Sequence, residues 1–333
     1  MKRKTIIIAE AGVNHNKNIN IAKNLISKAA TLGVNYIKFQ LFDPELIAKK
    51  NTSLAEYQKK NSSFSNQFDL LKNLSLDKKQ IDTLYNFCKK KKLGFLCSPF
   101  DINSAQILKK YNLDFLKIPS GEITNYPLID FIAKNFSRII LSTGMSTISE
   151  IRECLKHLTK YNIKRKNITL MHCTSAYPAN YKELNLLALN LLKKEFKLSL
   201  GYSDHSQLIL TPSIAVSLGA RIIEKHFTIN KNYKGPDHKA SLNPSEFKKM
   251  IEMIEIAENI LGVEKKIVTN TEKKNMLVVR KGIYARINIK KGDKFSEKNL
   301  ITLRPLEGFS AIKWPFLIGT KSKRNYKKFQ TIE

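Results

Sequence analysis

Two histidines stand at or just beyond the ends of apolar runs in the second half of the chain. His205 follows the run 197–203, and His226 ends the run 221–226. Neutral imidazole is a common ligand of Zn, Mn, Fe and Co, and a histidine pair beside water and a carboxylate suits a divalent ion that stays open to a substrate. Each histidine could instead only bond a backbone carbonyl, and the sequence leaves both interpretations open.

Lysines and hydroxyl side chains lie at the ends of other apolar runs. Cations and hydroxyl donors grouped together are suited to binding a phosphate or a carboxylate. A lysine with a depressed pKa could instead form a Schiff base, and that alternative predicts trapping by borohydride and indifference to chelators. The positions are Lys38, Lys117, Ser120, Ser142 and Ser203, and Glu10, Gln40, Ser98, Ser175 and Glu224 also lie at or beside run ends.

The elements that must position these residues alternate between short β-rich runs and longer helical patterns. Eight such units in about 260 residues are typical of a (β/α)8 TIM barrel, and no GxGxxG follows the first run to favour a doubly wound open sheet. The segments 19–33 and 243–262 have apolar residues at helical spacing, and each ends at a glycine. The predicted strands are 5–10, 35–40, 94–99, 114–120, 138–143, 168–174, 197–203 and 221–226.

Active sites of such barrels lie at the C-terminal ends of the strands, and alternate strand residues face the interior. If His226 points inward, Glu224 does as well, and Lys225 points outward. By the same alternation Asp204 points away from Ser203 and His205, so we expect it to be structural.

Two further regions complete the domain organisation. The long segment 43–76 follows the second run, where a loop is more often a lid than filler. We expect a barrel over 1–265, a linker over 266–280 and a small β-rich domain over 281–333.

The composition restricts the class of protein. The formal charge is +30, but it is nearly all scattered lysine, which favours a solvated basic surface over nucleic-acid binding. No apolar run approaches the roughly 18 residues of a membrane span, and four cysteines without CxxC spacing read as buried thiols. We therefore expect a cytoplasmic protein with no nucleic-acid or membrane partner.

The ordered motifs "IIAEAGVNHN", "IKFQ", "SPFD", "KIPSGEITNYPLI", "LSTGMST", "MHCTSAYP", "GYSDHS", "LGARIIEKHFT" and "GPDHKASL" resemble the sialic acid synthase family. The segment "INIKKGDKFSEKNLITLRP" is similar to the antifreeze-like (SAF) domain that follows the barrel in that family. Lys17 and Ser175 depart from the usual family residues. The resemblance implies an enzyme that condenses phosphoenolpyruvate with an open-chain N-acylated hexosamine, giving a nine-carbon 2-keto acid and phosphate.

The resemblance also implies roles for individual residues. His205 and His226 would hold a divalent metal, Mn²⁺ or else Mg²⁺ or Co²⁺, and Glu10 and Glu122 would work near the reacting centre. Arg304 would reach the N-acyl group from the other subunit of a domain-swapped homodimer. The remaining expected substrate contacts are Lys38, Ser98, Lys117, Ser120, Ser142, Ser175, Tyr177, Ser203 and Asp237.

The exact sugar is open at this point. N-acetylmannosamine, which gives N-acetylneuraminate, is the first expectation, and a 2,4-diacetamido hexose, which gives N,N'-diacetyllegionaminate, is the alternative. A non-enzymatic carbohydrate- or nucleic-acid-binding protein would explain the charge but leaves the polar residues at the strand ends without a role.

Overall fold

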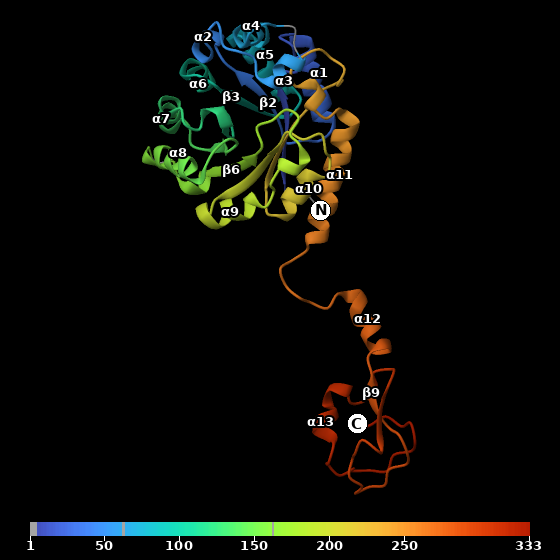
Figure 1. The fold of residues 1–333 in the computed structure, drawn as a ribbon. Helices are drawn as coiled ribbons and strands as arrows, with labels where there is room; N and C mark the ends of the chain where they lie inside the picture. The colour runs from blue at the N-terminus through green and yellow to red at the C-terminus, as the bar shows by residue number, and fades with distance from the viewer. Residues whose placement is uncertain (1–4, 62–63, 162) are drawn as a thin grey trace. The chain divides into compact units, whose positions relative to one another are not determined.

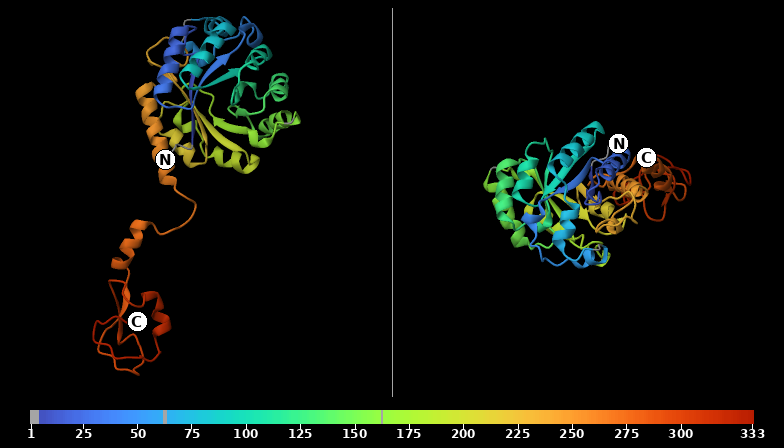
Figure 2. Two further views of the ribbon diagram at one scale, coloured as in Figure 1. Left: turned by 180° about the vertical axis from the view of Figure 1, so that it is seen from behind. Right: turned by 90° about the horizontal axis from the view of Figure 1, so that it is seen from above.

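The first part of the chain folds as a barrel of parallel strands surrounded by helices (Figures 1 and 2). The computed structural model describes residues 5–61, 64–161 and 163–333. The sheet order β3-β2-β1-β8-β7-β6-β5-β4 curls into a nearly closed barrel, which confirms the predicted fold class. The strands are β1 (Ile6–Gly12), β2 (Tyr36–Leu41), β3 (Gly94–Pro99), β4 (Leu116–Ile118), β5 (Ile139–Ser142), β6 (Ile168–Cys173), β7 (Ser199–Asp204) and β8 (Ile222–His226).

Helices cover the outside of the strands, and local capping signals define several of their starts. Helix α11 begins with a capping box in which Asn243 and Glu246 bond each other's backbone N–H, and it ends before Gly262 as predicted. The helices of this part are α1 (Ile19–Thr31), α2 (Pro44–Ile47), α3 (Glu56–Asn61), α4 (Gln67–Leu74), α5 (Lys78–Lys90), α6 (Ile102–Leu108), α7 (Tyr126–Asn135), α8 (Ile148–Lys160), α9 (Ala188–Phe196), α10 (Thr211–Ser217) and α11 (Pro244–Leu261).

Two apolar clusters separate the packing layers of the barrel. The larger cluster lies between strands and helices and includes Ile7, Phe39 and Phe247. The smaller cluster, with Ile8 and Met171, consists of strand residues of the opposite parity and fills the barrel interior. Strand alternation thus sends apolar residues in both directions, and the polar side chains collect at the C-terminal ends.

The strand register places the candidate site residues at one level. Glu10 pairs with Lys38 of β2 on one side and with His226 of β8 on the other. Ser203 of β7 pairs with Glu224 of β8. These four strand ends therefore deliver their polar side chains to the same end of the barrel.

The insertion between β2 and β3 carries α2, α3 and α4. Leu54, Leu70 and Leu74 pack against Val13 and Phe42, which lie just beyond the ends of β1 and β2. The lid role expected for 43–76 stays a prediction. No helix in the described ranges is both long and apolar enough to cross a membrane.

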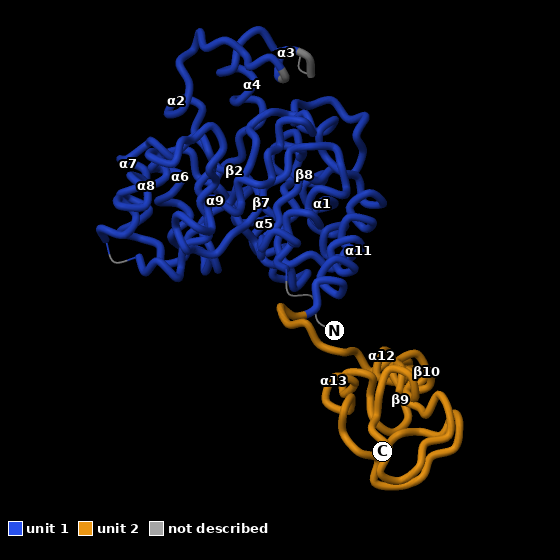
Figure 3. The backbone as a smooth tube through the Cα atoms, turned by 60° about the horizontal axis from the view of Figure 1, so that its bottom comes forward, with its two compact units in different colours: residues 1–262 blue, residues 263–333 orange. Residues whose placement is uncertain are grey.

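The chain divides into two compact units, residues 1–262 and 263–333 (Figure 3). The second unit contains α12 (Asn270–Val279), which lies in the predicted linker, an antiparallel pair of β9 (Gly282–Ala285) and β10 (Leu300–Leu303), and α13 (Trp314–Leu317). Its own apolar core includes Ile283, Phe295, Leu300 and Tyr326. Its assignment as an antifreeze-like domain stays a prediction.

Candidate active site

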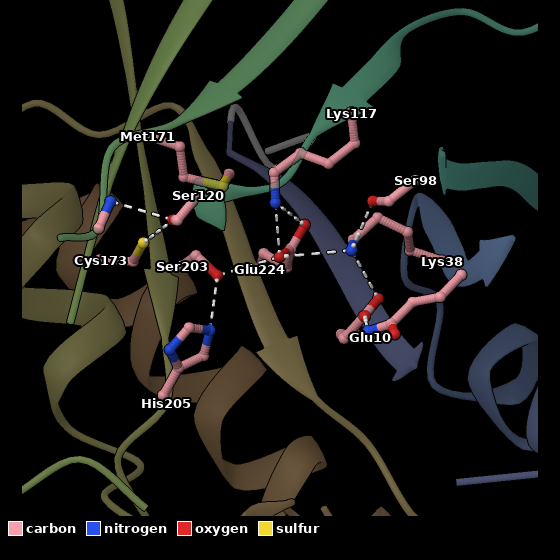
Figure 4. A network of polar contacts seen from close by, with 12 residues as sticks. Glu10, Lys38, Ser98, Lys117, Ser120, Met171, Cys173, Ser203, His205 and Glu224 are labelled. Atoms are coloured by element: carbon pink, nitrogen blue, oxygen red, sulfur yellow. Dashed lines mark hydrogen bonds and ion pairs between the residues drawn. The ribbon is translucent and has the colours of Figure 1, made fainter. Parts of the chain in front are cut away.

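Glu224 lies at the centre of a buried polar network at the C-terminal ends of the strands (Figure 4). Its carboxylate accepts hydrogen bonds from Lys117 Nζ at 2.8 and 3.0 Å and from Ser203 Oγ at 3.0 Å. Lys38 Nζ lies 3.7 Å from the same carboxylate. Strands β2, β4, β7 and β8 therefore meet through one carboxylate.

Lys38 links this carboxylate to a second one. Its ammonium group lies 3.0 Å from Glu10 Oε2 and donates to Ser98 Oγ at 3.2 Å. The other Glu10 oxygen accepts from Gln40 Nε2 at 3.2 Å. Two cations and two carboxylates are thus enclosed together, each side chain at most 5% exposed.

The pKa values of the two carboxyl groups are shifted in opposite directions. Burial alone would raise the pKa of Glu224, but Lys117 and Lys38 outweigh it and lower this pKa to about 2. Burial dominates at Glu10 and raises its pKa, although Lys38 opposes the shift. Glu224 is therefore the resident counter-anion of the lysines, and Glu10 is the carboxylate more ready to take a proton.

The lysines also differ. Burial lowers the pKa of Lys117 despite its ion pair with Glu224. At Lys38 the two carboxylates outweigh burial and raise the pKa. Two lysines whose pKa values are shifted in opposite directions therefore face the same interior. This arrangement is suited to an anion that carries more than one acidic group.

A crowded glycine lies beside the network, in the loop after β5. Gly144 N donates to Ser120 Oγ at 3.0 Å, and Ser120 Oγ lies 3.1 Å from Cys173 Sγ. A Cβ at Gly144 would lie 2.2 Å from Ser175 Oγ and 2.9 Å from Ser120 Oγ. Only glycine lets the backbone approach these hydroxyl groups so closely.

His205 and His226 lie beside each other, with ring centroids 5.5 Å apart. His205 Nδ1 lies 2.7 Å from the carbonyl oxygen of Thr174, so it carries the proton and leaves Nε2 with a lone pair. His226 Nδ1 is buried, has no hydrogen-bond partner among the residues that the structure describes, and lies 3.8 Å from Asp237 Oδ2. The predicted proximity of the two histidines is confirmed.

The surroundings keep both imidazoles neutral. Burial lowers the pKa of His205 to about 4 and that of His226 well below its ordinary value, where His205 adds to the effect. The Tyr177 ring lies 4.3 Å from the ring of His205 and 5.5 Å from that of His226. Burial and Glu10 raise the pKa of Asp237 to about 7.

These donors fit a divalent ion in part. A neutral His205 whose Nε2 keeps its lone pair and lies 3.3 Å from Ser203 Oγ, together with the orphaned buried Nδ1 of His226, is the chemistry of a two-imidazole site. Among the described residues, no group of three or more His, Cys, Asp and Glu is placed to hold a metal. The remaining positions would fall to water or substrate.

Strand alternation sorts the neighbouring charges as predicted. Lys225 Nζ donates to Asp204 Oδ2 at 2.6 Å and to the carbonyl oxygen of Ser206 at 2.6 Å. Asp204 also accepts from Ser206 N and from the Thr211 hydroxyl. Lys225 and Asp204 therefore form a separate buried pair, which confirms the structural role expected for Asp204.

Three predicted site residues stand outside the contacts of the network. Glu122, half-buried, accepts from Asn125 Nδ2 at 2.7 Å, and its pKa is raised by burial. Ser142 is buried at the end of β5. Arg304 follows β10 in the second unit and is exposed. The substrate roles of all three stay predictions.

Sequence reasoning gave Glu224 no role, although it placed the side chain inside the barrel. The signal was its position two residues before His226 on the same strand. Gln40 was noted only as a polar residue at the end of a run, and it proves to bond Glu10. Cys173 was treated as a buried thiol and also contacts Ser120.

The comparisons with known proteins identify a family and several relatives of the chain. The model of the NeuB family matches residues 25–266. The chain is 46% identical over 331 residues to N,N'-diacetyllegionaminic acid synthase of Campylobacter jejuni, covering 99% of each chain, and 38% identical to the enzyme of the same name from Legionella pneumophila, covering 98% of this chain and 92% of that one.

A solved structure of the N-acetylneuraminic acid (sialic acid) synthetase from Leptospira borgpetersenii superposes with a TM-score of 0.72 at 33% identity, covering 82% of this chain and 90% of that chain. The family model spans most of the barrel, and the Campylobacter relative spans nearly the whole chain. The chain therefore belongs to the NeuB family, the sialic acid synthase family that its motifs resemble.

Proposed function

We propose that this protein is a nonulosonic acid synthase, a transferase that condenses phosphoenolpyruvate with an open-chain N-acylated hexosamine. The observation that carries the proposal is the buried set of Lys38 and Lys117 around two carboxylates, beside the paired imidazoles of His205 and His226. The relatives named above support it, because they are synthases of this class of sugar acid.

The lysines are suited to phosphoenolpyruvate, which carries a phosphate and a carboxylate. Lys38 and Lys117 supply two positive charges that Glu10 and Glu224 neutralise in the free protein. Ser98, Ser120 and Ser203 add hydroxyl groups around them. Entry of the substrate redistributes the lysine contacts from resident carboxylates to substrate oxygens.

The reaction forms one carbon–carbon bond, and it replaces the carbon–oxygen bond to phosphate by a carbon–oxygen bond to the oxygen of water. The methylene carbon of phosphoenolpyruvate attacks the sugar aldehyde, water adds to the adjacent carbon, and phosphate leaves with the bridging oxygen. One proton of the water ends on the former aldehyde oxygen and the other on phosphate. Glu10, with its raised pKa, is suited to carry a proton between these positions.

A divalent ion bound by His205 and His226 would supply Lewis-acid polarisation of the aldehyde oxygen. Tyr177 packs against both imidazole rings and fixes their orientation. Asp237, near His226, lies where a sugar hydroxyl or a water could be bound. Mn²⁺ is the expected ion, with Mg²⁺ and Co²⁺ as alternatives.

The relatives favour a 2,4-diacetamido hexose as the sugar, with N,N'-diacetyllegionaminate as product. Two enzymes of that name, at 46% and 38% identity, cover the chain almost completely. N-acetylmannosamine, the first expectation from the sequence, stays the second candidate because the Leptospira sialic acid synthetase has the same barrel at 33% identity.

Phosphate release from phosphoenolpyruvate tests the proposal directly. The protein is incubated with Mn²⁺ and, in parallel, the 2,4-diacetamido hexose, N-acetylmannosamine or its 6-phosphate. We expect release with the diacetamido sugar at the highest kcat/KM. Release with none of the sugars, or covalent trapping of Lys117 or Lys38 by borohydride, would contradict the proposal.

The homodimer and the cytoplasmic location stay predictions from the resemblance and the composition. A chain truncated after residue 265 tests the dimer, because a domain-swapped dimer predicts that sugar binding is lost without the second unit. Full activity of the truncated barrel would show that it is complete alone.

A further inference from the structure

A basic cavity lies at the opposite end of the barrel from the candidate active site. It has a volume of about 430 Å³ and is lined by residues at the starts of β1, β6, β7 and β8 and just before β4 and β5. Ile6 lines it and Glu10 lies four residues further along β1, about 13 Å at the rise of a strand. The cavity is therefore separate from the network around Glu224.

Three cations line this cavity: Arg138, Lys166 and Arg221. The chain has 58 lysines and arginines, nearly all of them lysine, so two arginines in one cavity are not explained by the general basic composition. Arginine presents a planar fork of donors that matches a phosphate or carboxylate group, whereas lysine presents a point charge. The hydroxyl group of Ser199 adds a neutral donor.

Backbone hydrogen bonds fix the main chain of both arginines. Arg138 O accepts from Leu116 N at 2.9 Å, and Arg221 is bonded to both neighbouring strands, with its N–H donating to Leu200 O at 2.7 Å and its carbonyl accepting from Ile6 N at 2.9 Å. The guanidinium of Arg138 also lies over the Phe115 ring, 4.2 Å from its centroid. Part of the ordering cost of binding is thus already met in the free protein.

No carboxylate from the described part of the chain lines the cavity. Asp114 is next to Phe115 in the chain, but it accepts a hydrogen bond from the Tyr36 hydroxyl at 2.8 Å and does not line the cavity. None of the three cations forms an ion pair with a residue in the described part of the chain. Their charge is available to a ligand.

The floor of the cavity is apolar, formed by Ile6, Phe115 and Ile222. Phe115 and Ile222 belong to the cluster that fills the barrel interior, and Ile6 packs against it, so this apolar layer lies between the cavity and the active site. A cavity of this size accommodates a small organic molecule more readily than a single inorganic ion.

We infer that this cavity, the basal anion site, binds a small ligand with at least two anionic groups, phosphate or carboxylate, through Arg138, Arg221 and Lys166. The site does not depend on the proposed synthase reaction, because none of its residues belongs to the network around Glu224.

Calorimetric titration of the full chain with pyrophosphate, and separately with succinate, tests the inference. The variant R138Q/R221Q removes two charges at the site. The control K79Q/K248Q removes two charges from exposed lysines near the starts of α5 and α11, at the other end of the barrel. The candidate active site is unchanged in all three proteins, so its own anion binding is common to them.

We expect the wild-type protein and the lysine control to bind at least one of the two probes at a site that R138Q/R221Q binds about ten-fold or more weakly, as the loss of charge-assisted hydrogen bonds requires. If only pyrophosphate binding is weakened in R138Q/R221Q, the ligand carries phosphate groups. If succinate binding is weakened, the ligand carries carboxylate groups. Equal binding by all three proteins, or equal weakening in both variants, would show that no basal anion site exists. If R138Q/R221Q melts at a lower temperature than the wild-type protein, the single variant R221Q replaces it in the titrations.

Discussion

The substitution Glu224→Gln tests whether the charged carboxylate of Glu224 stabilises the fold as a counter-ion of the buried lysines. The pKa of Glu224 falls from 4.5 to about 2, and a difference of 2.5 units corresponds to about 3 kcal/mol of stability in favour of the charged carboxylate. Because the pKa is lowered on folding, this stability is present above pH 4.5 and is lost as the pH falls toward 2. At pH 7 we therefore expect Glu224→Gln to lower the free energy of unfolding by about 3 kcal/mol.

Glu10→Gln is the matched control. Glu10 is equally buried and also contacts Lys38, but its pKa is raised, so its charged form is not favoured by folding. We expect this second substitution to lower the free energy of unfolding by less than Glu224→Gln does, because burial disfavours the charge of Glu10 and Lys38 keeps Glu224 nearby.

Urea unfolding at pH 7, followed by far-ultraviolet circular dichroism, measures both variants. Trp314 is the single tryptophan of the chain and lies in the second unit, so its fluorescence gives an internal reference transition that we expect to stay unchanged. Phosphoenolpyruvate should restore part of the stability of Glu224→Gln, since it supplies anionic groups to Lys117 and Lys38. Equal losses in the two variants would refute this account of the network.

Four further predictions concern the site and its surroundings. His226→Ala should lower kcat by orders of magnitude while phosphoenolpyruvate binding survives, and loss of that binding in calorimetry would contradict the division of roles. Treatment with EDTA should abolish phosphate release and added Mn²⁺ should restore it; activity that persists in EDTA would exclude a required metal. Gly144→Ala should weaken phosphoenolpyruvate binding about ten-fold or more, because its Cβ would displace Ser175 and Ser120, and an unchanged Kd would show that these hydroxyl groups do not contact the substrate. His15 is fully buried with a pKa lowered to about 4, so its contribution to stability is present above its unfolded pKa near 6.5 and falls by about 2 kcal/mol between pH 7 and pH 5; His15→Asn should reduce the pH dependence of urea unfolding by that amount, and an unaltered pH profile would refute the assignment.

The barrel was predictable because its strands leave strong local signals. β-Branched runs separated by amphipathic segments gave all eight strands, and the alternation of side chains placed Glu224 and Lys225 on opposite faces. The capping box at the start of α11 and the glycine at its end are also local patterns, which explains why both limits were found from the sequence.

The contacts within the site were less predictable because they join strands that are far apart in the chain. Lys117 and Glu224 are separated by 107 positions, and only the closed barrel brings β4 and β8 to one interior. The role of Gly144 was hidden as well, since its need for glycine comes from the nearby Ser175 and not from a turn signal. Local sequence gave the direction of each side chain, whereas its partner depended on the whole fold.

The alternation of charge along β8 also specifies strand registration. Glu224 is bonded on one face of the strand and Lys225 on the other, each to a partner of opposite sign. A slip of β8 by one residue would put a lysine among the interior lysines and a carboxylate against Asp204, so both faces would oppose it at once. The two ion pairs thus fix the register of β8 from both faces of the strand. This register is the one that places His226 beside His205.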